Sequence, residues 1–472
     1  MADALGLFDE SFYLSNNLDV ARAVASDAFS SGFDHFNRFG KFEGRNPSAL
    51  FNTKFYLQQY NDIAIAFEKK QINPYDHFQE FGRFEGRDPS VFFNTRTYLE
   101  QNLDVAIAVS KKDITGFDHF LNYGINEGRG SSQPYQLLET FLVGNTNGNN
   151  VLRYNTKTGA FLGEFIPAGR GGLFAPDQLL YGPDGNGDGI SDLYISSGNK
   201  PANSGQPGAS AILRYDGLTG EFIDVFVGDN PNTPNVDESG GLIRPYGSAF
   251  GPDGILYVSS FLSDQILCYN ATTGQFVGVF ARGNQQPGGL NGPNGLFATP
   301  DGSLYVTTEG SVARNGTADF SDGLPSQVLR YNIYNAQSTV FATASPLPEN
   351  PGFTSLLGIA ISPQNGNLYV SDFANYIRSY DLNTGSLLNA ISTNYTGTSP
   401  TSNFIGSLAF APDGNLFTVG FDNRDGSNNI GAILRYDGTT GQPLPLPGNS
   451  SSIFVAPDSK LARPIGITFF PA

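Results

Sequence analysis

The chain has 472 residues and a formal net charge of −17, so it is long enough for more than one core and too acidic to favour nucleic acid or an anionic membrane as its main partner. No stretch approaches the roughly 18 apolar residues of a membrane span. The single cysteine, Cys268, excludes an intrachain disulfide, and we expect a buried structural thiol there. The first residues lack the basic and apolar segments of a recognisable signal peptide.

Residues 8–130 contain three copies of one unit. The histidines mark its period, because His35, His77 and His119 are spaced by 42 residues (77 − 35 = 42 and 119 − 77 = 42). Each copy begins with a Tyr-Leu pair and continues through Asp-Val-Ala or Asp-Ile-Ala, Asp-His-Phe and a glycine to Glu-Gly-Arg. We expect each histidine to form a hydrogen bond inside its own unit, because metal binding would require histidines from different copies to converge.

Short helices are expected within each copy, because apolar residues recur at helical spacing in segments such as LDVARAV. The helix that carries DHFNRFG should end at Gly40, a suitable C-cap residue. We therefore predict an all-α domain of three stacked units over residues 1–130, followed by a linker at 131–134. The joints between the units should be filled by aromatic side chains: Phe36, Phe39, Phe42 and Phe51.

These copies resemble a repeat of large bacterial, often cyanobacterial, surface and secreted proteins, whose units read FYL…NPDVA…HF…G…EGR. The resemblance covers nearly all of residues 8–130, although the copies here read NLDV and YNDI without the usual proline. It implies an extracellular or cell-surface location and a modular protein, and it implies no particular chemistry.

Six copies of a different pattern fill residues 135–472: a strand, then Tyr with Asn or Asp, then in most copies a Thr-Gly turn. The copies start at Val151, Ile212, Ile266, Val328, Tyr376 and Ile433. A second signature, Pro-Asp-Gly between two strands, precedes most copies but not the first, and the ending PIGITFFPA has the form of the strand that the first copy lacks. A ring closed by this terminal strand has no open edge, so the sequence predicts a six-bladed β-propeller.

The elaborated loops are predicted to lie on one face of this propeller. The turns between the first and second strands and between the third and fourth strands of the blades are short. The crossings between blades, and the loops between the second and third strands of blades 2, 4 and 6, are long. Loops on a rigid scaffold commonly carry function, so we expect the binding surface on this face.

The turn YGPDGNGDGISDLYIS in the second blade carries the strongest metal signal in the chain. It predicts a calcium loop with oxygen ligands at positions 1, 3, 5, 7 and 9. These ligands are Asp184, Asn186, Asp188, the backbone carbonyl of Ile190, and Asp192. The loop is similar to the DxNxDGxxDL loops of integrin-type propellers, and we expect Ca²⁺ to brace the hairpin there. The alternative is an Asn-Gly turn with solvated carboxylates.

The blade pattern resembles the NHL and gluconolactonase-like propeller superfamily over residues 135–472, which implies a scaffold, a ligand-binding protein or a calcium-dependent lactonase with a metal in the central channel. The residues expected to open the innermost strands are Asp177, Tyr246, Asn294, Leu357, Ile405 and Ile465. Only Asp177 and Asn294 are suitable metal ligands, no glutamate occupies these positions and no histidine lies in the propeller. We therefore assign no catalytic residue.

The combined reading is a non-catalytic bacterial cell-surface or extracellular protein, structural or adhesive, that self-assembles into a filament or layer and has a calcium-stabilised propeller. The alternatives are a calcium-dependent lactonase-like hydrolase and a propeller that binds surface glycan. Aromatic residues of the long loops that would stack on sugars are Phe261, Phe320, Phe373, Tyr376 and Phe421.

Overall fold

The computed structural model divides into two compact units: the first consists of Met1–Glu139, Gly187–Ile190 and Phe470–Ala472, and the second of Thr140–Asn186 and Ser191–Phe469. The predicted linker at 131–134 lies outside the described residues. None of the helices in the described part of the chain combines the length and the apolar character needed to cross a bilayer. The residues that the structure describes are 6–125, 127, 129, 140–187, 190–230, 237–348, 352–374, 376–424 and 426–471.

Short helices follow one another through the first unit. The first helix of each sequence copy begins after a side chain that accepts a hydrogen bond from the backbone N–H three residues on, and these N-caps are Asp9, Asn52 and Asn94. In chain order the helices are α1 (Glu10–Asn16), α2 (Leu18–Ala25), α3 (Gly32–His35), η1 (Phe36–Gly40), α4 (Lys41–Glu43), α5 (Thr53–Gln59), α6 (Asn61–Glu68), α7 (Pro74–His77), η2 (Phe78–Gly82), α8 (Thr95–Gln101), α9 (Leu103–Ser110), α10 (Gly116–His119) and η3 (Phe120–Gly124).

Each histidine forms a hydrogen bond inside its own copy, as expected, and its partner is the tyrosine of the opening motif. The distances from the Tyr hydroxyl to the His Nδ1 are 3.0 Å for Tyr13–His35, 3.0 Å for Tyr56–His77 and 2.9 Å for Tyr98–His119. Burial lowers the pKa of His35 and of His77, which favours the neutral imidazole. These side chains therefore have a structural role.

The aspartate and the arginine of the repeated motif also meet. In the first copy Arg45 binds both carboxylate oxygens of Asp19 at 2.8 Å. The corresponding ion pairs are Arg87–Asp62 at 2.8 Å and Arg129–Asp104 at 2.7 Å. The aspartate and the final arginine of the motif therefore form an ion pair in every copy, which accounts for their recurrence.

Gly40 does not end its helix, so that prediction was wrong. Its backbone is helical, with φ −56° and ψ −42°, and the left-handed residue that ends α4 is Gly44 at φ 80°. Glycine is needed at position 40 for a different reason, because a Cβ there would collide with the hydroxyl of Tyr13. The same close approach occurs between Gly82 and Tyr56 and between Gly124 and Tyr98.

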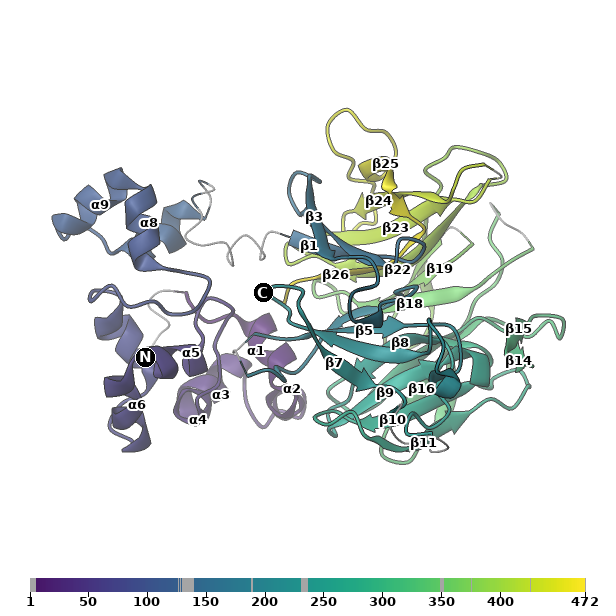
Figure 1. Cartoon of the computed structure of the whole chain (residues 1–472), viewed down its shortest axis with the longest axis horizontal. Helices are drawn as coiled ribbons and strands as arrows, with labels where there is room; N and C mark the ends of the chain where they lie inside the picture. The colour runs from purple at the N-terminus through teal and green to yellow at the C-terminus, as the bar shows by residue number, and fades with distance from the viewer. Residues whose placement is uncertain are drawn as a thin grey trace. The chain divides into compact units, whose positions relative to one another are not determined.

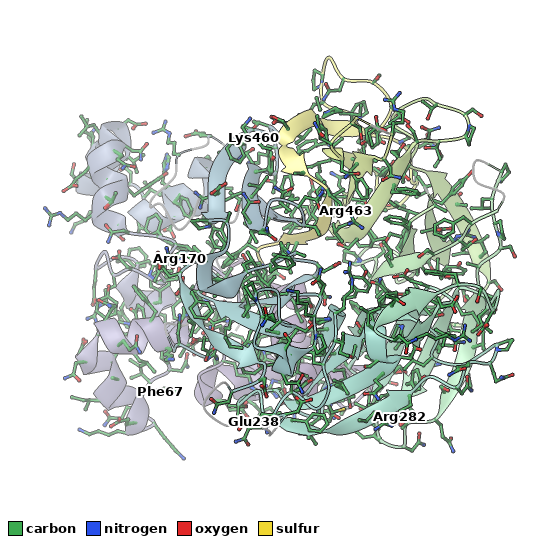
Figure 2. All side chains as sticks on the ribbon, turned by 45° about the vertical axis from the view of Figure 1, so that its right-hand side comes forward. Phe67, Arg170, Glu238, Arg282, Lys460 and Arg463 are labelled. Atoms are coloured by element: carbon green, nitrogen blue, oxygen red, sulfur yellow. The ribbon has the colours of Figure 1, made fainter. Side chains whose placement is uncertain are left out.

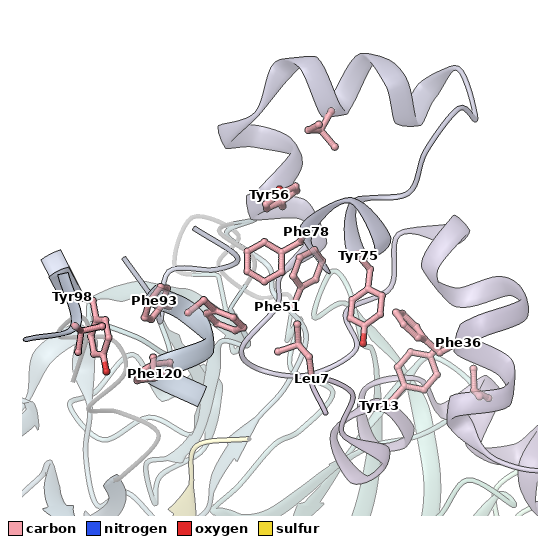
Figure 3. Packing of buried hydrophobic residues seen from close by; sticks show 14 residues of the cluster. Leu7, Tyr13, Phe36, Phe51, Tyr56, Tyr75, Phe78, Phe93, Tyr98 and Phe120 are labelled. Carbon is pink, nitrogen blue, oxygen red and sulfur yellow. The ribbon is translucent and has the colours of Figure 1, made fainter. Parts of the chain in front are cut away.

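Aromatic rings form the core of the first unit (Figure 3). Phe36 and Phe51 are fully buried, and both meet the ring of Tyr75 edge-on at centroid distances of 5.0 and 5.6 Å. The contact of Phe36 joins the first copy to the second, as predicted, whereas Phe51 and Tyr75 belong to the same copy. Such T-shaped contacts place the positive edge of one ring against the negative face of another. They link residues that are far apart in the sequence.

Phe39 and Phe42 do not fill a joint, so this part of the prediction was wrong. Their side chains are 42% and 58% exposed. Each lies beside a cationic neighbour at the surface, since Arg38 and Lys41 approach the two ring centroids to 5.3 and 5.5 Å.

The second unit is built from four-stranded antiparallel sheets, of which its described residues form six (Figure 1). From the innermost strand outward, blade 1 is β26 (Pro464–Phe469), β1 (Thr140–Asn145), β2 (Asn150–Asn155) and β3 (Phe161–Ile166), and blade 2 is β4 (Leu179–Tyr181), β5 (Leu193–Ser197), β6 (Ala211–Tyr215) and β7 (Phe222–Val227). Blade 3 is β8 (Pro245–Phe250), β9 (Ile255–Ser260), β10 (Gln265–Asn270) and β11 (Phe276–Arg282), and blade 4 is β12 (Pro293–Ala298), β13 (Ser303–Thr308), β16 (Gln327–Asn332) and β17 (Ser338–Thr343). Blade 5 is β18 (Leu356–Ile361), β19 (Leu368–Asp372), β20 (Tyr376–Tyr380) and β21 (Leu387–Ser392), and blade 6 is β22 (Asn403–Phe410), β23 (Leu416–Asp422), β24 (Ile430–Tyr436) and β25 (Ile453–Ala462).

The last strand of the chain completes the first blade, as predicted. Strand β26 lies beside β1 in Figure 1 and pairs with it antiparallel, with Phe141 opposite Phe469. Phe417 of blade 6 packs against both of these rings, at centroid distances of 5.7 and 5.1 Å. The two ends of the propeller therefore share one hydrophobic core, and the unit is a closed six-bladed β-propeller.

Cys268 lies in β10 and is buried, as expected of a structural thiol. Burial raises the pKa of this thiol to about 12. It is therefore protonated and unreactive at neutral pH.

The closure leaves no room for a side chain at Gly466 of β26, because a Cβ there would collide with the backbone carbonyl of Asp177 in the neighbouring blade. We expect Gly466→Ala to lower the free energy of unfolding by about 1–3 kcal/mol, the usual penalty of overpacking. Gly278→Ala in β11 is the control, since no atom lies within 4 Å of its Cβ position. Urea unfolding of both variants measures the difference, and equal stability would contradict the closure geometry.

Candidate functional site

The long loops lie at one end of the propeller, where the innermost strands begin and their neighbours end. The long loops of blades 2, 4 and 6 run from Ser197 to Ala211, from Thr308 to Gln327 and from Asp422 to Ile430. The second of these contains a small hairpin of β14 (Val312–Arg314) and β15 (Thr317–Asp319). Residues just before an innermost strand and just after the next strand therefore surround the propeller axis at the elaborated face.

Four charged side chains reach this place from four successive blades. In order around the ring they are Arg463 before β26, Asp177 before β4, Arg244 before β8 and Glu309 after β13, so their charges alternate in sign. Figure 2 labels Arg463 near the middle of the propeller. These four residues, together with Tyr246, Asn294 and Ser355, form what we call the axial cluster.

Two hydrogen bonds hold Glu309 in place. Asn294 Nδ2 donates to its Oε1 at 2.7 Å, and Ser355 Oγ donates to its Oε2 at 3.1 Å. Burial nevertheless raises the pKa of the Glu309 carboxyl to about 7, because loss of hydration outweighs these bonds and the nearby Arg244. The carboxyl group is therefore fixed in orientation and keeps its proton to a higher pH than a free glutamate does.

Arg244 is held at one side only. Its Nε donates to the hydroxyl of Tyr246 at 2.7 Å, and its guanidinium carbon lies 4.9 Å from the centre of that ring. Arg463 lies 5.6 Å from the centre of the Phe421 ring. Among the described residues, neither the terminal nitrogens of Arg244 nor the guanidinium of Arg463 have a hydrogen-bond or ion-pair partner.

Of the two carboxyl groups in the cluster, that of Asp177 has the pKa that is shifted further from its ordinary value. Burial raises the pKa of its carboxyl to about 7, the negative charge of Glu309 raises it further, and Arg244 and Arg463 oppose both effects. Its carboxylate has no hydrogen bond or ion pair with any other residue that the structure describes. Opposite charges thus act on one another across the cluster without direct pairing, which leaves groups of both signs available to a ligand.

The structure brings the two sequence candidates Asp177 and Asn294 into this one cluster. The sequence analysis considered only the residues that open the innermost strands, where no glutamate occurs, and so it did not consider Glu309, which follows the second strand of its blade. The arginines were also missed, although LIRPYG and LARPIG share an Arg-Pro pair directly before an innermost strand.

The strand register corrects one further candidate. Ile405 pairs with Gly420 as Pro245 pairs with Ser260, so the position that Tyr246 occupies in blade 3 is occupied in blade 6 by Gly406. Ile405 itself is fully buried between blades. The axis in blade 6 is therefore lined by backbone at this level.

Most of the loop aromatic residues that we considered for sugar stacking are buried in the propeller. Phe261, Tyr376 and Phe421 are buried, whereas Phe320 is 45% exposed. Phe373 is half-buried, and Phe404 of blade 6 stacks on it at 4.3 Å with an interplanar angle of 5°.

The predicted calcium turn is described only in part, since Asp188 and Gly189 lie outside the described residues. Asp192 is fully buried, and its Oδ2 accepts a hydrogen bond from the Gly185 N–H at 2.8 Å and lies 4.0 Å from a terminal nitrogen of Arg214. No group of three or more His, Cys, Asp or Glu side chains suited to a metal occurs among the residues that are described. The donor set of carboxylate and amide oxygens fits the chemistry of Ca²⁺.

Comparison with known proteins gives structural likeness only. No protein-family model and no curated protein matches the chain. One similar solved structure is a nidogen/laminin complex, with 13% identity, a TM-score of 0.44, and coverage of 70% of this chain and 98% of that chain. Another is the extracellular domain of a one-component system protein from B. thetaiotaomicron, with 14% identity, a TM-score of 0.38, and coverage of 65% and 32%. At these values neither likeness carries an argument about function.

The raised pKa of Asp177 predicts a pH dependence of stability. The pKa is about 7 in the folded chain and 3.8 for the free carboxyl, so between these values the folded state binds more protons than the unfolded state. The free energy of unfolding should therefore fall as the pH rises from about 4 to 7. Asp177→Asn should flatten this decline and raise stability at pH 8 by on the order of 2–4 kcal/mol. Urea unfolding at pH 5 and pH 8 tests this, and an unchanged difference between the two pH values would count against it.

Proposed function

We propose that this chain is a non-catalytic binding protein of the bacterial cell surface or extracellular space, and that its axial cluster binds a small polar ligand. One observation carries the proposal: charged groups of both signs, from four blades, gather at the elaborated end of the propeller without pairing with one another. These side chains are partly buried, and a partly buried, unpaired charge is costly unless something compensates it, as a ligand with complementary groups would do. The resemblance of residues 8–130 to bacterial surface-protein repeats supports the location.

The first unit would then act as an attachment or assembly module built from three helical repeats. The Tyr–His and Asp–Arg pairs occur in all three copies, which supports one shared structure. Exposed aromatic side chains also recur at the same place in each copy, at Phe39, Phe81 and Tyr123. Contacts through such a repeated surface would extend into a filament or layer if they do not close into a ring.

A calcium ion in the turn of blade 2 would stabilise the propeller, held by Asp184, Asn186, Asp188, Asp192 and the carbonyl of Ile190. We expect Ca²⁺ to raise the melting temperature of the purified chain by several degrees relative to chelator, and Asp184→Asn with Asp188→Asn to abolish that rise. Asp413→Asn is the control, because it changes the Pro-Asp-Gly turn of blade 6, which lacks the loop. Scanning calorimetry measures the shift, and negative-stain microscopy of the same samples shows whether assemblies depend on calcium. A double variant that still responds to Ca²⁺ would exclude this site.

The ligand role is tested by a thermal-shift screen of small polar molecules on the full chain. Ligands of the axial cluster should stabilise the wild type and lose this effect in Arg244→Met, while Arg282→Met should respond like the wild type. Arg282 is exposed at the end of the outermost strand β11, and Figure 2 labels it near the rim of the propeller. Ligands that stabilise all three proteins equally would place binding elsewhere.

Hydrolysis of a bound ester or lactone is the second candidate. It is favoured by two carboxyl groups with pKa values of about 7, Asp177 and Glu309, at one end of the propeller axis. A group with such a pKa is suited to accept a proton at neutral pH. Conversion of a screened compound by the wild type, lost in Asp177→Asn, would move the assignment from binding to catalysis.

A further inference from the structure

We infer that the axial cluster binds an amino-acid-type zwitterion with an apolar side chain, meaning a molecule with one carboxylate, one ammonium group and a hydrophobic tail. The inference rests on the proposed ligand role of the cluster and specifies the chemistry of the ligand. Three features of the site support it. They are the equal numbers of acidic and basic side chains, the charged groups that bind no described residue, and an aromatic wall formed by Phe373, Phe404 and Phe421.

Once both acidic side chains are ionised, the charges of the site balance. Two arginines and two acidic residues alternate around the axis, and each sign has at least one member without a direct partner among the described residues. A simple anion would compensate the arginines and increase repulsion at Asp177, and a simple cation would do the reverse. A zwitterion compensates both signs and adds no net charge to the site.

The unengaged groups suit the two ends of such a ligand. Arg244 is fixed through its Nε by Tyr246, so its terminal nitrogens are already oriented, and a guanidinium binds a carboxylate through two parallel hydrogen bonds. The Asp177 carboxylate, which no described residue engages, matches an ammonium group. Glu309 is held by Asn294 and Ser355 and would contribute mainly through its charge.

In blades 5 and 6, aromatic side chains occupy the positions at which the other blades carry charged side chains. Phe404 directly precedes Ile405 in β22, so it stands in blade 6 where Arg244 and Arg463 stand in their blades. Phe373 follows β19 as Glu309 follows β13. The site is therefore charged over blades 1 to 4 and aromatic over blades 5 and 6.

The aromatic wall is packed and adjoins the charged groups. Phe404 stacks on Phe373 at 4.3 Å, and both rings lie 6.1 Å from Phe421. Arg463 lies over Phe421, which joins the aromatic wall to the charged part of the ring. A ligand whose charged end meets Arg244 and Asp177 would place an apolar tail against Phe373 and Phe404, both of which keep partial exposure.

Isothermal titration calorimetry with four matched probes tests the inference on the full chain. L-phenylalanine has all three features, whereas 3-phenylpropanoate lacks the ammonium group, 2-phenylethylamine lacks the carboxylate and glycine lacks the tail. We expect L-phenylalanine to bind most tightly and each other probe to bind about tenfold more weakly or worse, as expected for the loss of one good polar or apolar contact.

Variants of the protein then test which residue binds the carboxylate and which binds the ammonium group of the ligand. Arg244→Met should weaken L-phenylalanine and 3-phenylpropanoate by about tenfold or more. Asp177→Asn should weaken L-phenylalanine while 3-phenylpropanoate binds as well as before or better, since a repelling charge is removed. Arg282→Met, as the control, should change neither. Affinity for L-phenylalanine should also rise between pH 6 and pH 8, as the Asp177 carboxyl ionises.

The outcomes separate this inference from the proposed function. If 3-phenylpropanoate binds as tightly as L-phenylalanine and depends on Arg244, the site is a carboxylate site, the ligand role stands and the zwitterion is wrong. If none of the four probes binds while the thermal-shift screen yields ligands that depend on Arg244, the inference again fails alone. If no ligand in either experiment depends on Arg244, both proposals fail.

Discussion

Closure of the ring by β26 is the constraint on which the rest of the propeller depends. Where the innermost strands of blades 1 and 2 meet, the backbone at Gly466 approaches the carbonyl of Asp177 so closely that no side chain fits between them. This contact brings Arg463, three residues before Gly466, into the same site as Asp177. The candidate site is thus a direct product of the closure, because one of its four charges belongs to the terminal segment.

Contacts of the arginines with aromatic rings explain how separated charges are tolerated in the axial cluster. Side chains free to move would pair Asp177 with Arg244 or Arg463, but each arginine also rests on an aromatic ring, Tyr246 or Phe421, which limits its movement. Burial then raises the pKa values of the acidic members. Such an arrangement sacrifices some stability, and proteins commonly accept this at sites of function.

The sequence predicted the features of the fold that depend on residues close together in the chain. The repeated strand and turn signatures predicted six blades, and PIGITFFPA predicted the closing strand, because turns and alternating burial depend on neighbouring residues. The same strand signatures singled out Asp177 and Asn294 as residues that open an innermost strand. Glu309 was missed because its place at the axis depends on the register between two strands, and Gly40 was misread because its role depends on Tyr13, 27 residues earlier (40 − 13 = 27).

Pairing between β1 and β26 also has a consequence for how the chain folds. Phe141 and Phe469, which face each other in blade 1, are 328 residues apart in the sequence (469 − 141 = 328). Blades 2 to 6 are each assembled from one continuous segment of the chain, so they can form by short-range contacts, while blade 1 must wait for both ends of the propeller. The entropic cost of closing so long a loop grows only logarithmically with its length. Blade 1 therefore forms late mainly because its strands must both be in place, and less because the closing step itself is unfavourable. Until that step, β1 exposes an unpaired edge, and the interval before closure is when the chain is most open to pairing with another copy of itself.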